Sequence, residues 1–391
     1  MNVILQRLLL VAVLAVALVG CGGDDDGGDT GAEPAVTQGS ETTQGTETSL
    51  DDLHIAYASA SDAIGIFKVV GDNLVTDAEK LGMKATRYDN NLDPQTAIRN
   101  ADLMIQEKPD IIIDWNAIVS AAPAIGKKVE RAGIPCLSVN QQIPGCHWFN
   151  LSNRQMGVDA ADVLVPMAKE RGWNADNTTV FMVIAAANGT EVNDGPRHFY
   201  ISIAEELEGF TKVAPEDITP QTTVIGDHHG LQIDGKSSIE DAYTAAKNVI
   251  QTIPKGNNIL LYGSDSDLSL GAFRALKEAG RDQQTLTCGL GATPEGLSQL
   301  RTNPQWMCEG ALFLEDWPRY IIAEAVAILR GETPPDLTPA PQVMLTKETV
   351  DTYYDGNKVK LLPPLPTDAE YLSDTGVLQQ LGPPEIEGLD D

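Results

Sequence analysis

The chain has 391 residues, the usual length of two domains, and 42% of them are hydrophobic, which excludes a chain that is disordered throughout. Its net charge of −29 at pH 7 argues against nucleic acid as a partner, because no basic stripe is present to neutralise phosphates. Much of that charge lies at the ends. Residues 22–52 contain nine acids and no base, and residues 351–391 contain nine acids and two lysines.

The first residues predict an export signal. Residues 1–20 carry one charge, Arg7, followed by an apolar run from Leu8 to Val19 that is too short to cross a bilayer as a helix. A basic start, a short apolar core and small residues at its end are typical of a signal peptide. The stretch "LVGC" also resembles the bacterial lipobox, in which the cysteine is lipidated. We therefore expect a lipid on Cys21, with an ordinary signal peptide and a chance cysteine as the alternative.

Two segments flank the predicted folded body. Residues 21–52 are rich in Gly, Asp, Thr, Glu and Gln and poor in apolar residues. Such a segment cannot bury enough surface to fold, so it is predicted to be a flexible tether. Residues 356–391 alternate prolines with acids and predict an irregular tail. The sequence leaves open whether this tail docks on the body.

From residue 53 the pattern alternates between short apolar runs and helical periodicity. In this first half the predicted strands are "LHIAYASA" (53–60), "KATRYD" (84–89), "DIIIDW" (110–115) and "IPCLSV" (134–139). The predicted helices between them are 65–83, 94–108 and 120–133. A repeated β-α order implies a parallel sheet with helices on both faces.

The same alternation restarts after residue 153. The predicted strands of this half are "TTVFMVIAA" (178–186), "QTTVIGD" (221–227), "NNILLYGS" (257–264) and "QTLTCGL" (284–290). The predicted helices are 154–171, 199–208, 239–253 and 268–279. Two consecutive units of this kind predict an α/β fold with two doubly wound parallel-sheet domains. Ligands of such sheets bind beyond the carboxyl ends of the strands, so we expect a ligand cleft between the domains.

Motifs that would indicate catalysis or a cofactor are missing from the sequence. No G-x-G-x-x-G follows the first strand, and neither a phosphate-binding loop nor the serine elbow G-x-S-x-G is present. The neighbouring histidines His228 and His229 lack the partners of a metal site. We therefore expect no enzyme activity, no cofactor and no metal.

Four cysteines remain once Cys21 is assigned to a lipid. An even number in an exported chain favours disulfides, and four cysteines allow three pairings. We favour Cys136 with Cys146, which would close a short excursion of the chain, and Cys288 with Cys308, which would link two strand-like segments. Buried free thiols are the alternative, because the sequence gives no distances.

Several of these stretches, taken in order, resemble a known family. "GIFKVVGDNLVTDAEKLGM", "DIIIDW", "AGIPCLSVNQQ", "DSDLSLGAFRALKEAG" and "CGLGATPEG" stand in the order seen in ribose- and galactose-type solute-binding proteins of ABC importers. The resemblance implies the type I periplasmic-binding fold, in which a three-segment hinge joins the two domains. The crossings are expected near residues 151–153, 313–316 and 341–344. The N-terminal domain would then comprise 53–151 plus 315–342, and the C-terminal domain 152–314 plus 343–355.

The resemblance also suggests ligand-binding residues. Phe67 matches an aromatic residue that stacks on a sugar ring, with a plain core role as the alternative. Arg197 matches an arginine that binds sugar oxygens through its fork of donors. Asn140 and Gln141 stand where the family usually has an aspartate and an arginine. Asp265 matches an amide or carboxylate at a strand end, and a helix-capping role is compatible with that.

Three other positions depart from the family pattern. Gly291, Leu314 and Ile64 stand where the family usually has polar contacts. Either other residues replace them, or the ligand has fewer hydroxyls than a free pentose or hexose. Trp115 is the candidate replacement wall, with acceptors from Asp114 and Asn116 beside it, or from Glu315 and Asp316 at the second crossing.

The sequence therefore predicts a monomeric lipoprotein on the outer face of the cell membrane. It would capture a sugar or a sugar-like polyol and deliver it to an ABC permease. The alternative is a sensor lipoprotein that presents its closed form to a membrane receptor.

Overall fold

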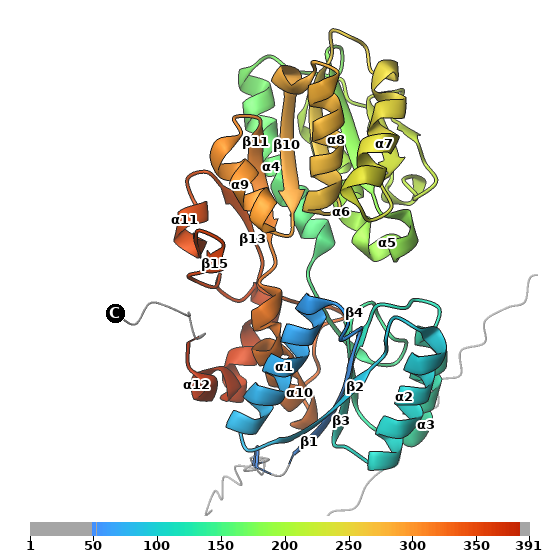
Figure 1. Cartoon of the computed structure of the whole chain (residues 1–391), viewed down its shortest axis with the longest axis vertical. Coiled ribbons are helices and arrows are strands. Elements are labelled where there is room, and N and C mark those ends of the chain that lie inside the picture. The colour runs from blue at the N-terminus through green and yellow to red at the C-terminus, as the bar shows by residue number, and fades with distance from the viewer. Residues whose placement is uncertain (1–48, 52, 384–391) are drawn as a thin grey trace, which may run out of the picture. The chain divides into compact units, whose positions relative to one another are not determined.

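The computed structural model describes residues 49–51 and 53–383, and all of them belong to one compact unit. They form two mainly parallel sheets with helices on both faces, coloured blue to cyan and green to orange in Figure 1. We call each sheet with its helices a lobe. The fold is therefore the expected α/β fold with two doubly wound sheets.

The N-terminal lobe has a six-stranded, fully parallel sheet of order β12-β5-β4-β3-β1-β2. Its strands are β1 (His54–Ser59), β2 (Lys84–Asp89), β3 (Ile111–Asn116), β4 (Cys136–Asn140), β5 (His147–Asn150) and β12 (Thr338–Pro339). Its helices are α1 (Gly65–Lys80), α2 (Pro94–Glu107), α3 (Ala122–Ala132) and α10 (Trp317–Leu329). Helices α1 and α10 pack together, as do α2 and α3, and each pair contributes to a separate hydrophobic core.

The C-terminal lobe has a seven-stranded sheet of order β13-β11-β10-β9-β6-β8-β7, with both edge strands antiparallel. Its strands are β6 (Thr178–Ile184), β7 (Val224–Ile225), β8 (Gly230–Asp234), β9 (Asn258–Gly263), β10 (Thr285–Leu290), β11 (Trp306–Ala311) and β13 (Val343–Thr346). Its helices are α4 (Asn153–Glu170), α5 (Gly189–Val192), α6 (Asp194–Glu206), α7 (Ile239–Val249), α8 (Ser266–Glu278), α9 (Pro294–Thr302) and α11 (Val350–Tyr353). Helices α4 and α6 pack together, as do α7 and α8.

Local sequence explains where several helices begin. Asp93 precedes α2 and accepts a hydrogen bond from the Thr96 backbone N–H (2.7 Å), with Pro94 at the first helical position. Strand β3 is buried on both faces, which explains its continuous apolar run.

One predicted strand is wrong. The central parallel strand after β6 is β8, whereas the predicted run 221–227 contributes only the two-residue antiparallel edge strand β7. The predicted run contains Val224 and Ile225, which favour strands, whereas β8 contains Gly and Asp, which do not. The chain turns between them because Gly226, Asp227 and His228 take positive φ angles of 54°, 53° and 73°.

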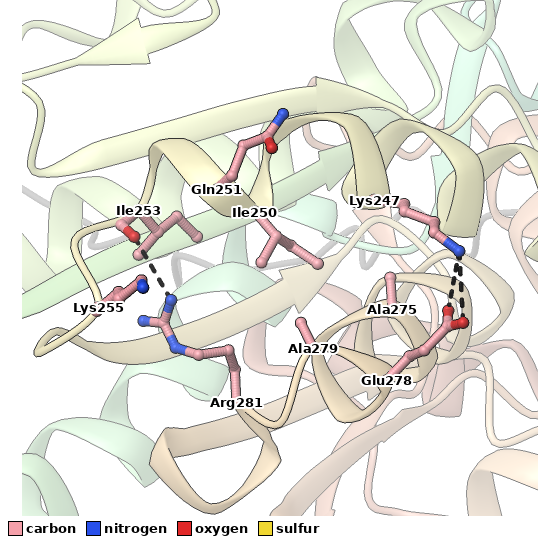
Figure 2. Close-up of a pocket in the computed structure, with 9 residues that line it drawn as sticks. All are labelled: Lys247, Ile250, Gln251, Ile253, Lys255, Ala275, Glu278, Ala279 and Arg281. Atoms are coloured by element: carbon pink, nitrogen blue, oxygen red, sulfur yellow. Dashed lines mark hydrogen bonds and ion pairs between the residues drawn. The ribbon is translucent and has the colours of Figure 1, made fainter.

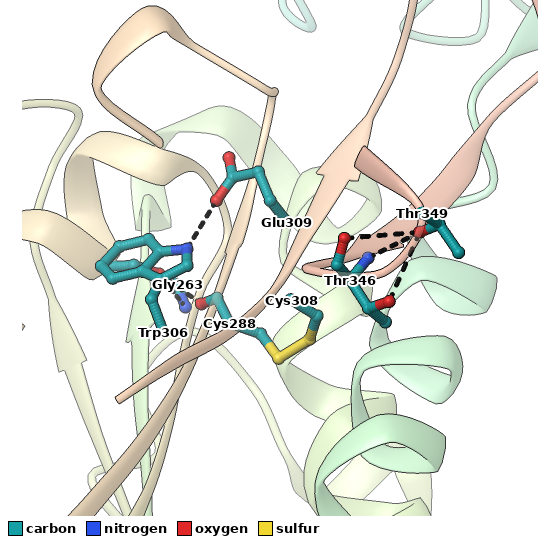
Figure 3. Close-up of a disulfide and its surroundings, with 8 residues drawn as sticks. Gly263, Cys288, Trp306, Cys308, Glu309, Thr346 and Thr349 are labelled. Atoms are coloured by element: carbon teal, nitrogen blue, oxygen red, sulfur yellow. Dashed lines mark hydrogen bonds between the residues drawn. A yellow bond between two sulfur atoms is a disulfide. The ribbon is translucent and has the colours of Figure 1, made fainter. Parts of the chain in front are cut away.

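The chain passes three times between the sheets, as the resemblance implies. It leaves β5 at Asn150 and enters α4 at Asn153, leaves β11 at Ala311 and enters α10, and leaves β12 at Pro339 and enters β13. Disulfides join Cys136 to Cys146 and Cys288 to Cys308, the pairing that the sequence favoured, with Cα–Cα distances of 4.8 and 4.6 Å. The second joins directly paired residues of β10 and β11 (Figure 3).

The C-terminal segment is more ordered than expected. The hairpin β14 (Tyr354–Asp355) and β15 (Lys358–Val359) follows α11. The chain then returns to the N-terminal lobe, where the 3-10 helix η6 (Thr367–Thr375) and helix α12 (Val377–Leu381) pack on α10. Leu362, on the way, packs against the cores of both lobes. The described part of the tail therefore docks on the body as a fourth connection between the sheets.

Candidate functional site

A cavity of about 930 Å³ is lined by residues of both lobes. Its polar lining includes Asn140 at the end of β4, Asn153 at the start of α4, and the residues that directly follow β9. In the C-terminal lobe β9 lies beside β6, where the strand order reverses. The carboxyl ends of strands at such a reversal are where open α/β sheets bind ligands. The cavity is therefore the candidate ligand site.

The turn from β9 into α8 supplies polar groups to the cavity. Ser264, Asp265 and Asp267 line it. Asp265 is also the N-cap of α8, where its Oδ1 accepts a hydrogen bond from the Leu268 backbone N–H (2.8 Å). Burial raises the pKa of its carboxyl to about 6, although the backbone N–H of Leu268 opposes that shift. One side chain thus caps a helix and presents a carboxylate to the cavity.

Behind this turn lies a fully buried carboxyl group, Glu309 on β11 (Figure 3). It accepts hydrogen bonds from Trp306 Nε1 (3.0 Å), the Ala292 backbone N–H (3.1 Å) and the Ser266 hydroxyl. Burial raises its pKa to about 7. Since Ser266 and Ala292 line the cavity, Glu309 holds the β9–α8 and β10–α9 turns in place behind it.

The second crossing contributes aromatic and acidic residues. Phe313 stacks on Tyr354 of β14 with ring centroids 5.7 Å apart and planes 19° from parallel. Its φ of 52° is a left-handed conformation that non-glycine residues rarely adopt. The next turn, the 3-10 helix η5 (Leu314–Asp316), places Glu315 and Asp316 in the cavity wall. Burial raises the pKa of Asp316 to about 6.

At the first crossing, two amides hold a carboxylate. Asn150 and Asn153 each donate through Nδ2 to Glu191 Oε1 of α5, at 3.2 and 2.9 Å. Burial raises the pKa of Glu191. Asn153 and Val192 line the cavity. The Glu191 carboxylate, which Asn153 binds, therefore lies next to the cavity wall.

Two of the six predicted ligand residues line the cavity. They are Asn140, which is held in a left-handed conformation (φ 70°), and Asp265. The Nδ2 of Asn140 donates to the Asn116 carbonyl at 3.2 Å. Gln141 instead connects the lobes, since its Nε2 donates to the Asn188 carbonyl (3.1 Å) after β6.

The structure does not place the other three at the cavity. Trp115 is 3% exposed and stacks on Trp317 of α10 at 5.3 Å, so it belongs to the N-terminal core. The ring of Phe67 is half-buried and lies 5.5 Å from Trp115. Arg197 donates to Asp194 Oδ1 (2.9 Å) and to the Ile218 carbonyl (3.0 Å). Its guanidinium therefore ties α6 to the loop that follows it.

A second cavity, of about 570 Å³, lies between α7 and α8 (Figure 2). Three of its charged residues already have partners in the protein. Lys247 faces Glu278, and Arg281 donates to the carbonyls of Ile253, Pro254 and Asn257. These pairings hold the protein together, so this cavity is a weaker candidate for a ligand.

Comparison with known proteins identifies the family. The family model of the periplasmic binding protein domain matches residues 55–330.

The chain belongs to the periplasmic binding protein family.

Members of this family bind solutes and are not enzymes. Among proteins with curated descriptions, none matches this chain.

Solved structures show the same fold. A solute-binding protein of an ABC transporter from Mycobacterium smegmatis, with bound glycerol, is 16% identical; the match covers 79% of this chain and 100% of that one, with a TM-score of 0.61. A periplasmic ribose ABC transporter protein from Conexibacter woesei is 16% identical; the match covers 78% of this chain and 95% of that one, with a TM-score of 0.61. A solute-binding protein from Bacillus halodurans with bound myo-inositol is 17% identical over 78% and 97%, with a TM-score of 0.57.

Several cavity residues were not predicted as ligand residues. Ser264 and Asp267 lie next to Asp265 in "GSDSD". The sequence pattern therefore indicated this turn, but only Asp265 was predicted to bind the ligand. Phe313 and Tyr354 gave no signal, because a left-handed backbone and a ring stack across 41 positions are tertiary features. Glu315 and Asp316 were suggested as acceptors from their place at the crossing, and they do line the cavity.

The described residues contain neither a metal-binding cluster nor a membrane-spanning helix. They contain no group of three or more His, Cys, Asp or Glu residues placed to hold a metal ion. In the same part of the chain, no helix is both long and apolar enough to span a membrane. Cys21 and the predicted signal peptide lie outside the described residues.

Proposed function

We propose that the protein is an extracytoplasmic solute-binding lipoprotein that captures a sugar or a sugar-like polyol and delivers it to an ABC permease. The observation that carries this proposal is the cavity between the lobes, in which Asp265 and Ser264 follow β9 at the reversal of strand order. Polar groups that converge in a largely apolar cavity are typical of small-molecule sites. The ligands named for the related structures are glycerol, ribose and myo-inositol, which are all polyhydroxylated.

In this proposal binding works without catalysis. Asp265, Asn140 and Asn153 would hydrogen-bond the solute hydroxyls, and the Phe313–Tyr354 pair would contact its apolar face. The three crossings would act as a hinge, so that the two lobes close around the solute. Such a motion would have to accommodate the direct contacts between the lobes, among them the bonds of Gln141 to the Asn188 carbonyl and of Asn150 to Glu191, and the docked tail.

The lipid anchor is a separate part of the proposal and rests on the sequence "LVGC". A lipid on Cys21, followed by a flexible acidic segment, would keep the binder near its permease. The Cys21→Ser variant should be released from the membrane fraction while the wild type sediments with it. Equal membrane association of the two proteins would disprove the anchor without affecting the binding proposal.

A thermal-shift screen of sugars and polyols tests the solute class. A solute that binds only the folded state raises the melting temperature by mass action. We expect at least one sugar or polyol to raise it. If none does while a different class of metabolite does, the proposed solute class is wrong.

A further inference from the structure

The cavity between the lobes carries an excess of negative charge. Four carboxylates line it, Asp265, Asp267, Glu315 and Asp316, against one basic residue, Lys358. Among the described residues, none of the four carboxylates forms an ion pair with a lysine or arginine, although the positive charge of Arg319 acts on Asp316. The half-buried Glu191 and the fully buried Glu309 add two carboxyl groups next to the residues that line the cavity.

An independent observation concerns a buried hydroxyl group of the cavity wall. Ser264 lines the cavity and is only 4% exposed. Its hydroxyl has no hydrogen-bond partner among the described residues. Buried hydroxyls are nearly always paired, because an unpaired one loses its bonds to water without replacement. Ser264 directly precedes Asp265 in the turn from β9 into α8, so both belong to the same part of the cavity wall.

Aromatic rings complete one side of the cavity. Phe313 and Tyr354 line it as a stacked pair, 5.7 Å apart; each is 5% exposed, so only a small part of each residue is accessible. Burial, and then the negative charges of Glu309, Asp316 and Glu315, raise the pKa of Tyr354, so these carboxylates act on the same ring. Aromatic faces next to carboxylates bind cations, because the face of the ring carries partial negative charge.

We infer that the solute carries a protonated amine, so that the cavity binds an amino sugar or amino polyol in preference to the neutral parent compound. The inference rests on the proposed function and narrows its solute class. The ammonium lies against the carboxylate of Asp265 and toward the wall that Phe313 and Tyr354 line. The Ser264 hydroxyl pairs with a neighbouring hydroxyl of the solute.

The charges explain why this class is favoured. Carboxylates in a partly buried cavity repel one another and lose hydration, which costs free energy in the empty protein. A bound ammonium removes that repulsion and forms charge-assisted hydrogen bonds, whereas a neutral hydroxyl does less of both. A sugar acid adds a further negative charge and is rejected.

Calorimetry with matched solutes tests the inference. The full chain, purified in mild detergent with EDTA present, is titrated with three amines: glucosamine, galactosamine and 1-amino-1-deoxysorbitol. Each is compared with its N-acetyl form, which keeps the nitrogen but removes the charge, and with its neutral parent, glucose, galactose or sorbitol. We expect at least one amine to bind about 30-fold or more tightly than both of its partners.

Two variants then locate the effect. Asp265→Asn keeps a helix-capping side chain and removes the charge, so it should weaken binding of that amine by about 30-fold or more. Asp93→Asn is the matched control, because Asp93 also caps a helix but does not line the cavity. It should leave the affinity unchanged.

The outcomes separate the two proposals. If neutral sugars or polyols bind and their amines bind no more tightly, the inference is wrong and the proposed function stands. If neither set binds, the inference is wrong, and the thermal-shift screen of sugars and polyols decides the proposed function separately. Equal losses in Asp265→Asn and Asp93→Asn would also overturn the inference. The inference would also be overturned if calcium chloride alone, added without EDTA, raised the melting temperature of the wild type but not that of Asp265→Asn. The carboxylates would then bind a metal ion.

Discussion

Truncating Leu372 should strongly destabilise the N-terminal lobe, although this residue lies in a segment whose sequence predicts an irregular tail. Leu372 of η6 is 0% exposed and belongs to the same core as α1 and α10. The carbonyls of the segment are also bound: Arg330 Nη1 donates to Thr375 (2.8 Å), and Arg319 Nη2 donates to Gly382. The structure therefore makes the tail part of the lobe.

The size of the effect follows from burial. Replacing a fully buried leucine by alanine costs about 2–5 kcal/mol of unfolding free energy. With a urea m-value of about 3 kcal/mol/M, a loss of 3 kcal/mol lowers the unfolding midpoint by about 1 M. Leu361→Ala, in the same segment but 51% exposed, is the matched control and should cost under about 1 kcal/mol. Equal midpoints for the two variants in urea titrations followed by circular dichroism would refute the docking of the tail.

Three further results are expected. Glu324 of α10 is buried with a pKa raised to about 8, so the folded state binds its proton more tightly than the unfolded state does. Stability should therefore fall as pH rises from about 4.5 to 8. Over that pH range the melting temperature of Glu324→Gln should fall less than that of the wild type or of Glu79→Gln, a control at an exposed residue. Arg197→Ala should lower the melting temperature, because it removes the hydrogen bonds of Arg197 to Asp194 and to the Ile218 carbonyl. It should weaken amine binding less than Asp265→Asn does. A variant that loses binding but keeps its melting temperature would show that Arg197 is a ligand residue. Phe313→Leu should weaken amine binding about 3- to 30-fold in calorimetry, and an unchanged affinity would remove the ring from the site.

The layers of the fold could be predicted because each element carries its own local signal. The apolar run of β3 is buried on both faces, and Asp93 with Pro94 marks the start of α2. The exchange of β7 and β8 was missed because Val224–Ile225 are strong strand formers, whereas Gly230–Asp234 begins with Gly and ends with Asp, which strands disfavour. Only the left-handed turn between them decides which one joins the parallel sheet.

The site was harder to predict because its geometry is tertiary. Asp265 could be found, since a carboxylate at the end of an apolar strand is a local pattern. Trp115 also ends an apolar strand, but α10 brings Trp317 against it from about 200 residues away, so it became core. A single residue type at a strand end therefore identifies a candidate, and packing by distant segments decides whether it faces the cavity.

The central claim is that a solute binds between the lobes at Asp265. The most direct test is a crystal structure of the protein grown with the solute that raises its melting temperature most. We predict that the solute will lie within hydrogen-bond distance of Asp265 and Ser264 and against the Phe313–Tyr354 pair. A solute bound instead in the cavity between α7 and α8, with the first cavity empty, would contradict the account.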